Sequence, residues 1–161
     1  EPIPTLFETM LLCQQLGLGL NIEIKENKQN TLKTVEKIVS TVQTLENAFK
    51  GSLVFSSFST DILRALKSIA PEWPRGLLVT SFYKNLKDEL DQLGCFSLHP
   101  SLSCLQNSRD ISLALELGLP LVPYTVNDVS LARLLMKHRI FSFITDDPSS
   151  FAVAKLDHHF I

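Results

Sequence analysis

A carboxylate and an ammonium group lie two positions apart in the sequence Leu-Asn-Ile-Glu-Ile-Lys at residues 20–25. Side chains alternate along a strand, so Glu23 and Lys25 would share one polar face, with Cα atoms about 6.5 Å apart. This spacing can hold a hard cation and an anionic group side by side, which suits phosphate chemistry. The alternative is an ion pair that only satisfies the two charges. A strand between two helical patterns is normally apolar on both faces, so we predict that this polar face belongs to a site.

The composition excludes several classes of protein. The chain has 161 residues, of which 45% are hydrophobic, and this is typical of one compact domain with a core. Its formal net charge is -2 and it has no dense stripe of Lys or Arg, which argues against a nucleic-acid or anionic-membrane surface. No apolar run approaches the ~18 residues of a membrane span. We therefore expect neither a nucleic-acid partner nor a membrane span, with the oligomeric state left open.

Three cysteines, Cys13, Cys95 and Cys104, are an odd number without the spacing of a metal site. Each lies in or beside an apolar segment, which predicts buried thiols and a reducing, cytoplasmic location. The first residues, Glu1 and Pro2, include neither an initiator Met nor the basic and apolar regions of a signal peptide. We therefore expect the chain to be a piece of a longer protein.

Six strand-helix units are predicted along the chain, because short apolar runs alternate with residues that recur at helical spacing. Capping residues mark the helix starts, at Thr5 (with Glu8 in a capping box), Ser59, Asp128 and Asp147. Glycines mark the helix ends, at Gly17, Gly51, Gly94 and Gly118. The predicted strands are residues 20–25, 53–58, 76–80, 95–99, 121–126 and 141–145.

Polar side chains end all six predicted strands, and this decides between two architectures. A doubly wound sheet concentrates its ligand groups at one switch point, whereas a (β/α)8 barrel collects them from the carboxyl ends of strands all round the ring. We therefore predict an α/β fold of the (β/α)8, TIM-like barrel type. A full barrel has eight strands in about 250 residues, so two further strands are expected upstream of Glu1. Residues 1–161 would then be the C-terminal part of a single domain.

The sequence resembles the glycerophosphodiester phosphodiesterase family over nearly its whole length. The resemblance rests on short motifs in family order and near family spacing, and the ordered set is more specific than any one of them. The motifs are Ile3-Pro-Thr-Leu6, Leu20-Asn-Ile-Glu-Ile-Lys25, Ser56-Ser-Phe58, Pro74-Arg-Gly-Leu-Leu78, Ser97-Leu-His-Pro100, Tyr124-Thr-Val-Asn127 and Ile144-Thr-Asp146.

This resemblance implies a hydrolase of lipid and glycerol metabolism that converts glycerophosphodiesters to glycerol 3-phosphate and an alcohol. It implies one divalent cation, Mg²⁺ or Ca²⁺, with Glu23 as a metal ligand and Lys25 in contact with the phosphate. It also implies that substrate is bound or enclosed by Ser57, Phe58, His99, Tyr124 and Asn127. The family usually has Trp at the position of Tyr124, so the aromatic wall is kept and the shape of the pocket changes.

The family's two catalytic histidines and its Glu-x-Asp metal pair belong to motifs that precede the matched region. Neither of two internal histidines can replace them, because His99 matches another motif and His138 is predicted at a helix C-terminus, where the helix dipole favours it. His158 and His159 lie in a tail without a motif. We therefore expect the activity in the intact protein and no activity in residues 1–161 alone.

Two alternative functions remain open at this point. One is a barrel lyase that uses Lys25 as a Schiff-base nucleophile, although the neighbouring Glu23 would favour the charged amine and work against this chemistry. The other is a non-catalytic barrel remnant that is kept for binding or assembly.

Overall fold

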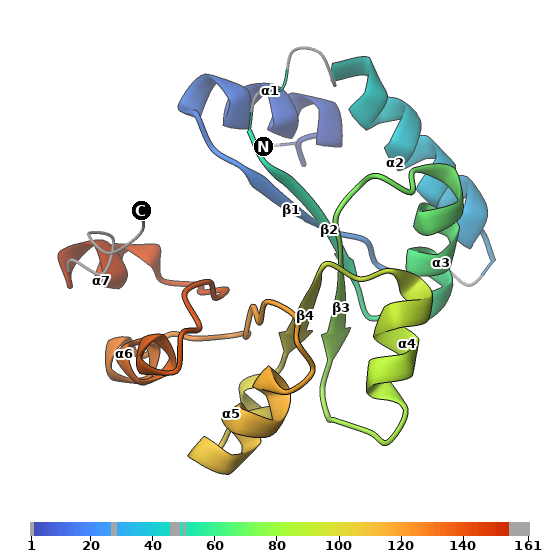
Figure 1. The fold of residues 1–161 in the computed structure, drawn as a ribbon. Helices are drawn as coiled ribbons and strands as arrows, with labels where there is room; N and C mark the ends of the chain where they lie inside the picture. Colours follow the sequence, from blue (N-terminus) through green and yellow to red (C-terminus); the bar gives the residue numbers. More distant parts are fainter. Residues whose placement is uncertain (1, 27–28, 46–48, 50, 155–161) are drawn as a thin grey trace. The chain divides into compact units, whose positions relative to one another are not determined.

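The computed structural model describes residues 2–26, 29–45, 49 and 51–154, which form two compact units (Figure 1). The first unit runs to Leu77 and also includes Gln92–Cys95. The second unit contains Leu78–Asp91 and the residues from Phe96 onward. Strand β3 (Arg75–Val79) begins in the first unit and ends in the second.

Helices and parallel strands alternate in the first unit, as the sequence predicts. Its elements before β3 are α1 (Leu6–Leu16), β1 (Leu20–Glu23), α2 (Thr31–Leu45), β2 (Leu53–Ser57) and α3 (Thr60–Ile69). Strand β2 lies between β1 and β3 and pairs in parallel with both (Figure 1). Strand β1 is two residues shorter than predicted. The helix whose end Gly51 was predicted to mark is described as far as Leu45, and residues 46–48 and 50 lie outside the described part.

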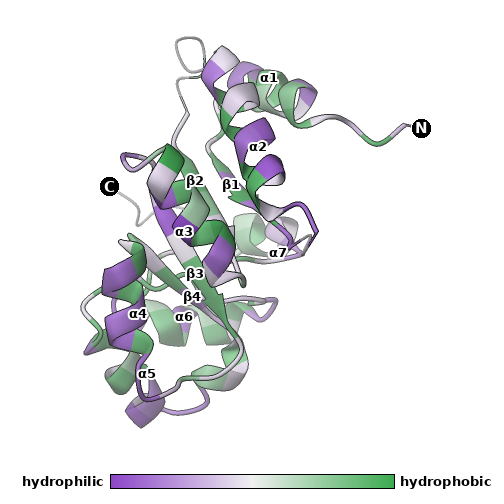
Figure 2. Ribbon diagram, turned by 90° about the vertical axis from the view of Figure 1, so that its right-hand side faces the viewer, coloured by the Kyte–Doolittle hydropathy of each residue, from purple (hydrophilic) through white to green (hydrophobic). Residues whose placement is uncertain are grey.

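One apolar cluster joins the strands of the first unit to α1, α2 and α3. Ile24 and Phe55 contribute from the strand side, and Trp73 stacks on Phe55 with ring centroids 4.8 Å apart. The helices contribute residues at helical spacing, namely Met10, Val35, Val39, Val42, Ile62 and Leu66. Figure 2 shows α3 with alternating hydrophilic and hydrophobic stretches, the colouring of an amphipathic helix. The alternating strand thus turns its apolar face to the helices and leaves its polar face for the site.

Predicted caps fix the helix ends. The hydroxyl of Thr5 accepts a hydrogen bond from the backbone N–H of Glu8 at 3.2 Å, and the Glu8 carboxylate accepts one from the N–H of Thr5 at 2.8 Å. Gly17 closes α1 in the left-handed conformation with φ of 67°. This confirms the predicted capping box and the predicted end of the helix. Within the described residues, no helix has the length and apolar character needed to cross a membrane.

Arg75, at the start of β3, holds two helix ends in the first unit. Its side chain is buried and donates six hydrogen bonds to carbonyl oxygens, at the ends of α3 and α4 (Leu86–Leu93) and in the segment between α3 and β3. The acceptors are Ala70, Pro71, Trp73, Leu93 and Gly94. Burial lowers the pKa of the guanidinium. A cation that satisfies helix C-terminal carbonyls is favoured by the helix dipoles, so we assign Arg75 to stability.

The second unit contains most of α4 and the later elements. They are β4 (Ser97–Pro100), the short 3-10 helix η1 (Leu102–Cys104), α5 (Ser108–Leu115), α6 (Val129–Lys137) and α7 (Pro148–Val153). Strand β4 neighbours β3 and begins two residues later than predicted. The predicted N-caps Asp128 and Asp147 are confirmed, as is the position of His138 at the end of α6. The tail with His158 and His159 lies outside the described residues.

The last two predicted strands are not continuous strands. Residues 121–126 make two isolated parallel bridges, Leu98 with Leu121 and Ser101 with Tyr124. Residues 141–145 contact that segment through two backbone hydrogen bonds, Val126 N–H to Ile144 O and Ile144 N–H to Pro123 O, both 2.8 Å. On the side of β4, the N–H groups of Val122 and Tyr124 donate to Leu98 and Pro100, and the bond that is missing there would need an N–H on Pro100. On the side of residues 141–145, Pro123 has no N–H to donate. The prediction of six full strands is therefore wrong at these two segments, although their backbones run parallel to β4 or to each other.

The prediction of buried cysteines is confirmed for two of the three. Cys95 and Cys104 are buried and Cys13 is half-buried. Burial raises the pKa of the Cys104 thiol, which keeps it in the neutral form.

Candidate functional site

A pocket of about 340 Å³ opens at the carboxyl ends of β1 and β2 in the first unit. It is lined by residues 23–26 after β1 and by residues 57–59 after β2. Four of the predicted site residues, Glu23, Lys25, Ser57 and Phe58, therefore lie in one pocket. The other three, His99, Tyr124 and Asn127, belong to the second unit.

Glu23 and Lys25 lie in this pocket without forming an ion pair. Exposure alternates along this segment: Glu23 and Lys25 are exposed, whereas Ile24 between them is buried. In the part of the chain that the structure describes, the only ion pairs are Arg64 with Asp61 and Lys87 with Asp91. The interpretation of Glu23 and Lys25 as a charge-satisfying pair is therefore wrong. Both groups are left available for a ligand.

Ser56 places a second oxygen beside Glu23. The two residues are partners in the parallel register of β1 and β2, so their side chains leave the sheet on the same face. The Ser56 side chain is fully buried, and its Oγ has no hydrogen-bond partner among the described residues. A buried hydroxyl without a partner costs free energy, so this oxygen is a candidate to contact a ligand.

The hydroxyl of Ser57 is hydrogen-bonded to backbone atoms. Its buried hydroxyl donates a hydrogen bond of 2.7 Å to the carbonyl oxygen of Ile24 and accepts one of 3.0 Å from the N–H of Ser59. Sequence reasoning predicted Ser57 as a substrate-binding residue. In the structure its hydroxyl joins the ends of β1 and β2 beneath the pocket.

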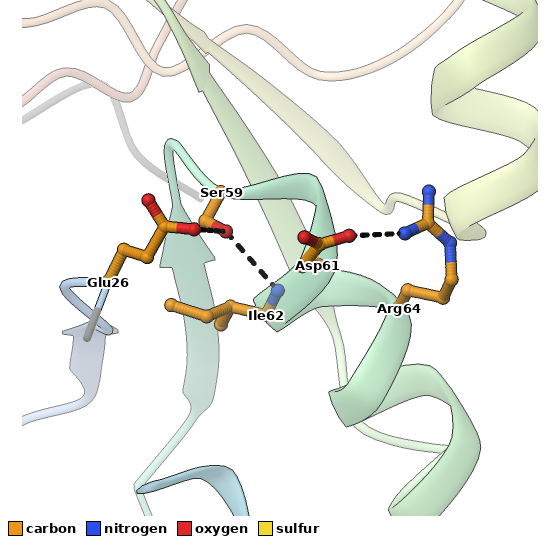
Figure 3. Close-up of polar contacts among 5 residues, drawn as sticks. All are labelled: Glu26, Ser59, Asp61, Ile62 and Arg64. Atoms are coloured by element: carbon orange, nitrogen blue, oxygen red, sulfur yellow. Dashed lines mark hydrogen bonds and ion pairs between the residues drawn. The ribbon is translucent and has the colours of Figure 1, made fainter. Parts of the chain in front are cut away.

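Two residues of the pocket were missed or only partly assigned by sequence reasoning. Glu26 follows Lys25 directly, and its carboxylate accepts a hydrogen bond of 3.2 Å from the hydroxyl of Ser59 (Figure 3). Ser59 was predicted only as the N-cap of α3, a role that is confirmed by its contact with the N–H of Ile62. No local motif signals the bond between Glu26 and Ser59, because the partners are far apart in the sequence. Beside them, the ring of Phe58 is 51% exposed at the pocket.

His99 in β4 is buried and neutral. Its Nε2 lies 2.9 Å from Oγ of Ser97, and its Nδ1 has no partner among the described residues. Burial lowers the pKa of His99 from 6.5 to about 4, so the ring is uncharged at neutral pH. A buried neutral imidazole with one open nitrogen can exchange a hydrogen bond with a ligand hydroxyl without adding a charge.

Tyr124 and Asn127 shape the second unit. The half-buried Tyr124 donates a hydrogen bond of 3.0 Å from its hydroxyl to the carbonyl oxygen of Val79. The side-chain oxygen of Asn127 accepts bonds from the hydroxyl of Thr145 at 3.0 Å and from the N–H of Asp146 at 2.9 Å. Asn127 therefore ties its own loop to residues 145–146, and its polar atoms are largely used in doing so.

The residues present fit one side of a divalent-cation site. The carboxylate of Glu23 lines the pocket, and the buried hydroxyl of its register partner Ser56, which is not a lining residue, is a second oxygen of the kind that Mg²⁺ and Ca²⁺ prefer. These ions take six or more ligands, whereas no group of three or more His, Cys, Asp or Glu side chains suited to a metal occurs in the described ranges. Glu23 and Ser56 can therefore supply part of a coordination shell and not all of it.

Comparisons with known proteins identify the family of this chain. Residues 1–150 match the Glycerophosphoryl diester phosphodiesterase family. A glycerophosphodiester phosphodiesterase from Caldanaerobacter subterraneus is 30% identical over 159 residues, covering 93% of this chain and 60% of the relative. A phosphodiesterase from Oleispira antarctica, solved in complex with the product sn-glycerol-3-phosphate, has a TM-score of 0.82 and 29% identity, covering 94% of this chain and 61% of that protein.

A third similarity concerns the fold alone. A glycerophosphodiester phosphodiesterase from Parabacteroides distasonis has a TM-score of 0.77 at 20% identity, covering 96% of this chain and 64% of that protein. These likenesses confirm the predicted fold class, an α/β barrel of the phosphodiesterase type of which this chain forms part. The chain spans about three fifths of the length of the relatives that it matches. It belongs to the Glycerophosphoryl diester phosphodiesterase family.

Proposed function

We propose that the intact protein hydrolyses glycerophosphodiesters to glycerol 3-phosphate and an alcohol with the help of one divalent cation. The observation that carries the proposal is the pocket in which Glu23 and Lys25 are both exposed and not paired with each other. A carboxylate and a lysine that are both available can bind a cation and a phosphodiester together. Family membership and the glycerol 3-phosphate complex of the Oleispira antarctica protein support the substrate class.

Glu23 would hold the cation, with Ser56 beside it. A divalent cation, Mg²⁺ or Ca²⁺, supplies Lewis-acid polarisation of a phosphoryl oxygen when it is bound. Lys25 would donate hydrogen bonds to the phosphoryl oxygens and stabilise the negative charge that grows there. We propose that the other metal ligands and the general acid and base come from residues of the intact protein outside the described part.

Substrate contacts would come from three side chains. In the first unit the exposed ring of Phe58 lies at the pocket, and Ser57 would hold the shape of that pocket because its hydroxyl is bonded to the backbone. In the second unit His99 would offer its Nδ1 to a glycerol hydroxyl, Tyr124 would supply an aromatic surface, and Asn127 would hold its own loop in shape. The buried thiols support the further proposal of a cytoplasmic location.

The lyase alternative is not favoured by the pocket. A Schiff-base lysine needs a desolvated surrounding to become neutral, whereas Lys25 is exposed beside Glu23 and Glu26. Trapping with borohydride in the presence of a carbonyl substrate would label Lys25 in a lyase and leave it unmodified in a phosphodiesterase.

The test is product identification with the intact protein. Phosphorus NMR of a reaction with glycerophosphocholine should show glycerol 3-phosphate as the phosphorylated product. Formation of phosphocholine instead would mean that the other ester bond is cleaved. No hydrolysis of any glycerophosphodiester would favour the non-catalytic alternative.

A further inference from the structure

Two hydroxyl groups of the turn after β2 reach the residues on either side of Lys25. Ser57 donates a hydrogen bond of 2.7 Å to the carbonyl oxygen of Ile24, and Ser59 donates one of 3.2 Å to the carboxylate of Glu26. Figure 3 shows Glu26 and Ser59 facing each other across the space between the segment after β1 and the start of α3. The residues immediately before and after Lys25 are thus both tied to one turn.

This turn is itself held rigidly. The N–H of Ser59 donates to Oγ of Ser57 at 3.0 Å, so the two hydroxyls are linked. Oγ of Ser59 also accepts from the N–H of Ile62 at 3.5 Å, which joins it to the first turn of α3 (Figure 3). Ser57 is buried and Ser59 is half-buried, so water competes weakly for the bonds within the turn, whereas the bond from Ser59 to Glu26 is exposed to solvent.

Lys25 has few other constraints. Strand β1 ends at Glu23, so Lys25 lies beyond the last paired residue of the ladder. Its side chain is a flexible four-carbon stem with a compact charge, and it is exposed. A charge that must meet a phosphoryl group contributes most when it is already in place, so the position of the backbone at Lys25 matters for the rate.

We propose that Glu26, Ser57 and Ser59 are positioning residues for Lys25. The inference rests on the proposed function, in which Lys25 contacts the phosphate. Loss of the contact between Ser59 and Glu26 would free the segment after β1 at its outer end. Turnover would then fall because Lys25 is misplaced, although the charge of Lys25 itself is unchanged.

Variants at Glu26 separate the hydrogen bond from the charge. Glu26→Gln keeps an oxygen that can accept from Ser59 and removes the negative charge beside Lys25, so it should retain most of the turnover. Glu26→Ala removes the acceptor and should lower kcat by about tenfold to a hundredfold. If the charge were what mattered, the two variants would lose activity equally, which would overturn the proposal.

A variant at Ser59 separates positioning from helix capping. Ser59→Asp keeps a good N-cap for α3, but Asp cannot donate to Glu26 and places a like charge beside it. It should therefore lower kcat as strongly as Glu26→Ala while Tm stays close to that of the native protein. The matched control is Asp61→Asn, in the same first turn of α3, because Asp61 pairs with Arg64 and takes no part in the contact (Figure 3).

The experiment is steady-state hydrolysis of glycerophosphocholine by the intact protein, with Lys25→Met and thermal unfolding measured alongside. The proposal is supported if Glu26→Ala and Ser59→Asp both have a reduced kcat and an unchanged Tm. It also requires that the double variant Glu26→Ala/Ser59→Ala has a kcat no lower than that of Glu26→Ala alone. If Lys25→Met is impaired but Glu26→Ala and Ser59→Asp turn over normally, the positioning role is overturned and the proposed function stands. If the native protein is inactive, or Lys25→Met is fully active, the proposed function fails and the inference fails with it.

Discussion

Glu23 of β1 lies opposite Ser56 of β2 in the parallel register, with an exposed carboxylate on one strand and, on the next, a buried hydroxyl that has no hydrogen-bond partner among the residues that the structure describes. Paired positions of neighbouring parallel strands direct their side chains to the same face of the sheet. The opposite face carries Ile24 and Phe55 into the helix-covered core. The two sides of this sheet are thus divided between packing and a site.

The Ser56 hydroxyl should contribute to function at some cost to stability. Replacing a buried hydroxyl that lacks a partner by Ala removes a desolvation cost of about 1 kcal/mol or more. Ser56→Ala should therefore be as stable as the native protein or more stable, and it should need more metal or substrate for half-maximal activity. Denaturant unfolding and metal titration measure the two effects. A clear loss of stability with unchanged titrations would assign Ser56 to the fold alone.

Lys25→Met should slow turnover, and excess metal should not restore the rate. The lysine stabilises charge on the phosphoryl oxygens, an effect of about 3 kcal/mol, or roughly a hundredfold in kcat. The matched control is Lys33→Met on the exposed side of α2, which should leave kcat unchanged. Recovery of Lys25→Met at high metal concentration would show that the roles of Glu23 and Lys25 have been exchanged.

His99 should make stability fall as the pH is lowered from about 6.5 to about 4. The folded protein holds His99 neutral because its pKa is lowered by burial, whereas the unfolded chain takes up a proton at the ordinary value. The unfolded state therefore binds more protons in this window, and stability is full above it and decreases below. The loss attributable to His99 is about 3 kcal/mol.

The measurement for His99 is the free energy of unfolding at pH 7 and pH 4.5, for the native protein and for His99→Gln. The native protein should lose more stability between the two pH values than the variant. Equal losses would mean that other groups account for the acid sensitivity and that His99 protonates freely in the fold.

Arg75→Met should lower the free energy of unfolding by about 3 kcal/mol or more, because it removes the donor to five buried or half-buried carbonyl oxygens at once. The control is Arg64→Met, which breaks a solvent-exposed ion pair with Asp61 and should cost about 1 kcal/mol or less. Denaturant unfolding compares the two. Similar small losses would show that water replaces the guanidinium at β3.

The sequence allowed the local features to be predicted. Thr5, Ser59, Asp128 and Asp147 cap helices through bonds to backbone groups two or three residues away, so the signal and the structure lie in the same short stretch. The two faces of residues 20–25 followed from the twofold period of a strand. The prediction that the polar face of residues 20–25 belongs to a site could be made without knowing which strand pairs with them.

Long-range relations could not be predicted in this way. The bonds from Ser57 to Ile24 and from Ser59 to Glu26 each cross 33 residues, and no sequence pattern records that they will meet. The strand at 121–126 was overpredicted, because its apolar run suits a strand while Pro100 in β4 and Pro123 each lack a donor that a ladder needs. The site residues of the two units were inferred from family motifs, which say which residues to expect and not what each one bonds to.

The most direct test of the central claim is a metal titration of the intact protein and its Glu23→Gln variant. Both proteins are stripped with a chelator, and glycerol 3-phosphate release is followed as Mg²⁺ or Ca²⁺ is added back, with Glu36→Gln on α2 as the matched control. We predict no activity without metal, recovery of the native protein and the control at the same metal concentration, and recovery of Glu23→Gln only at a much higher one. Full activity in the chelator, or identical titrations for Glu23→Gln and the native protein, would contradict the assignment of Glu23 to a catalytic cation.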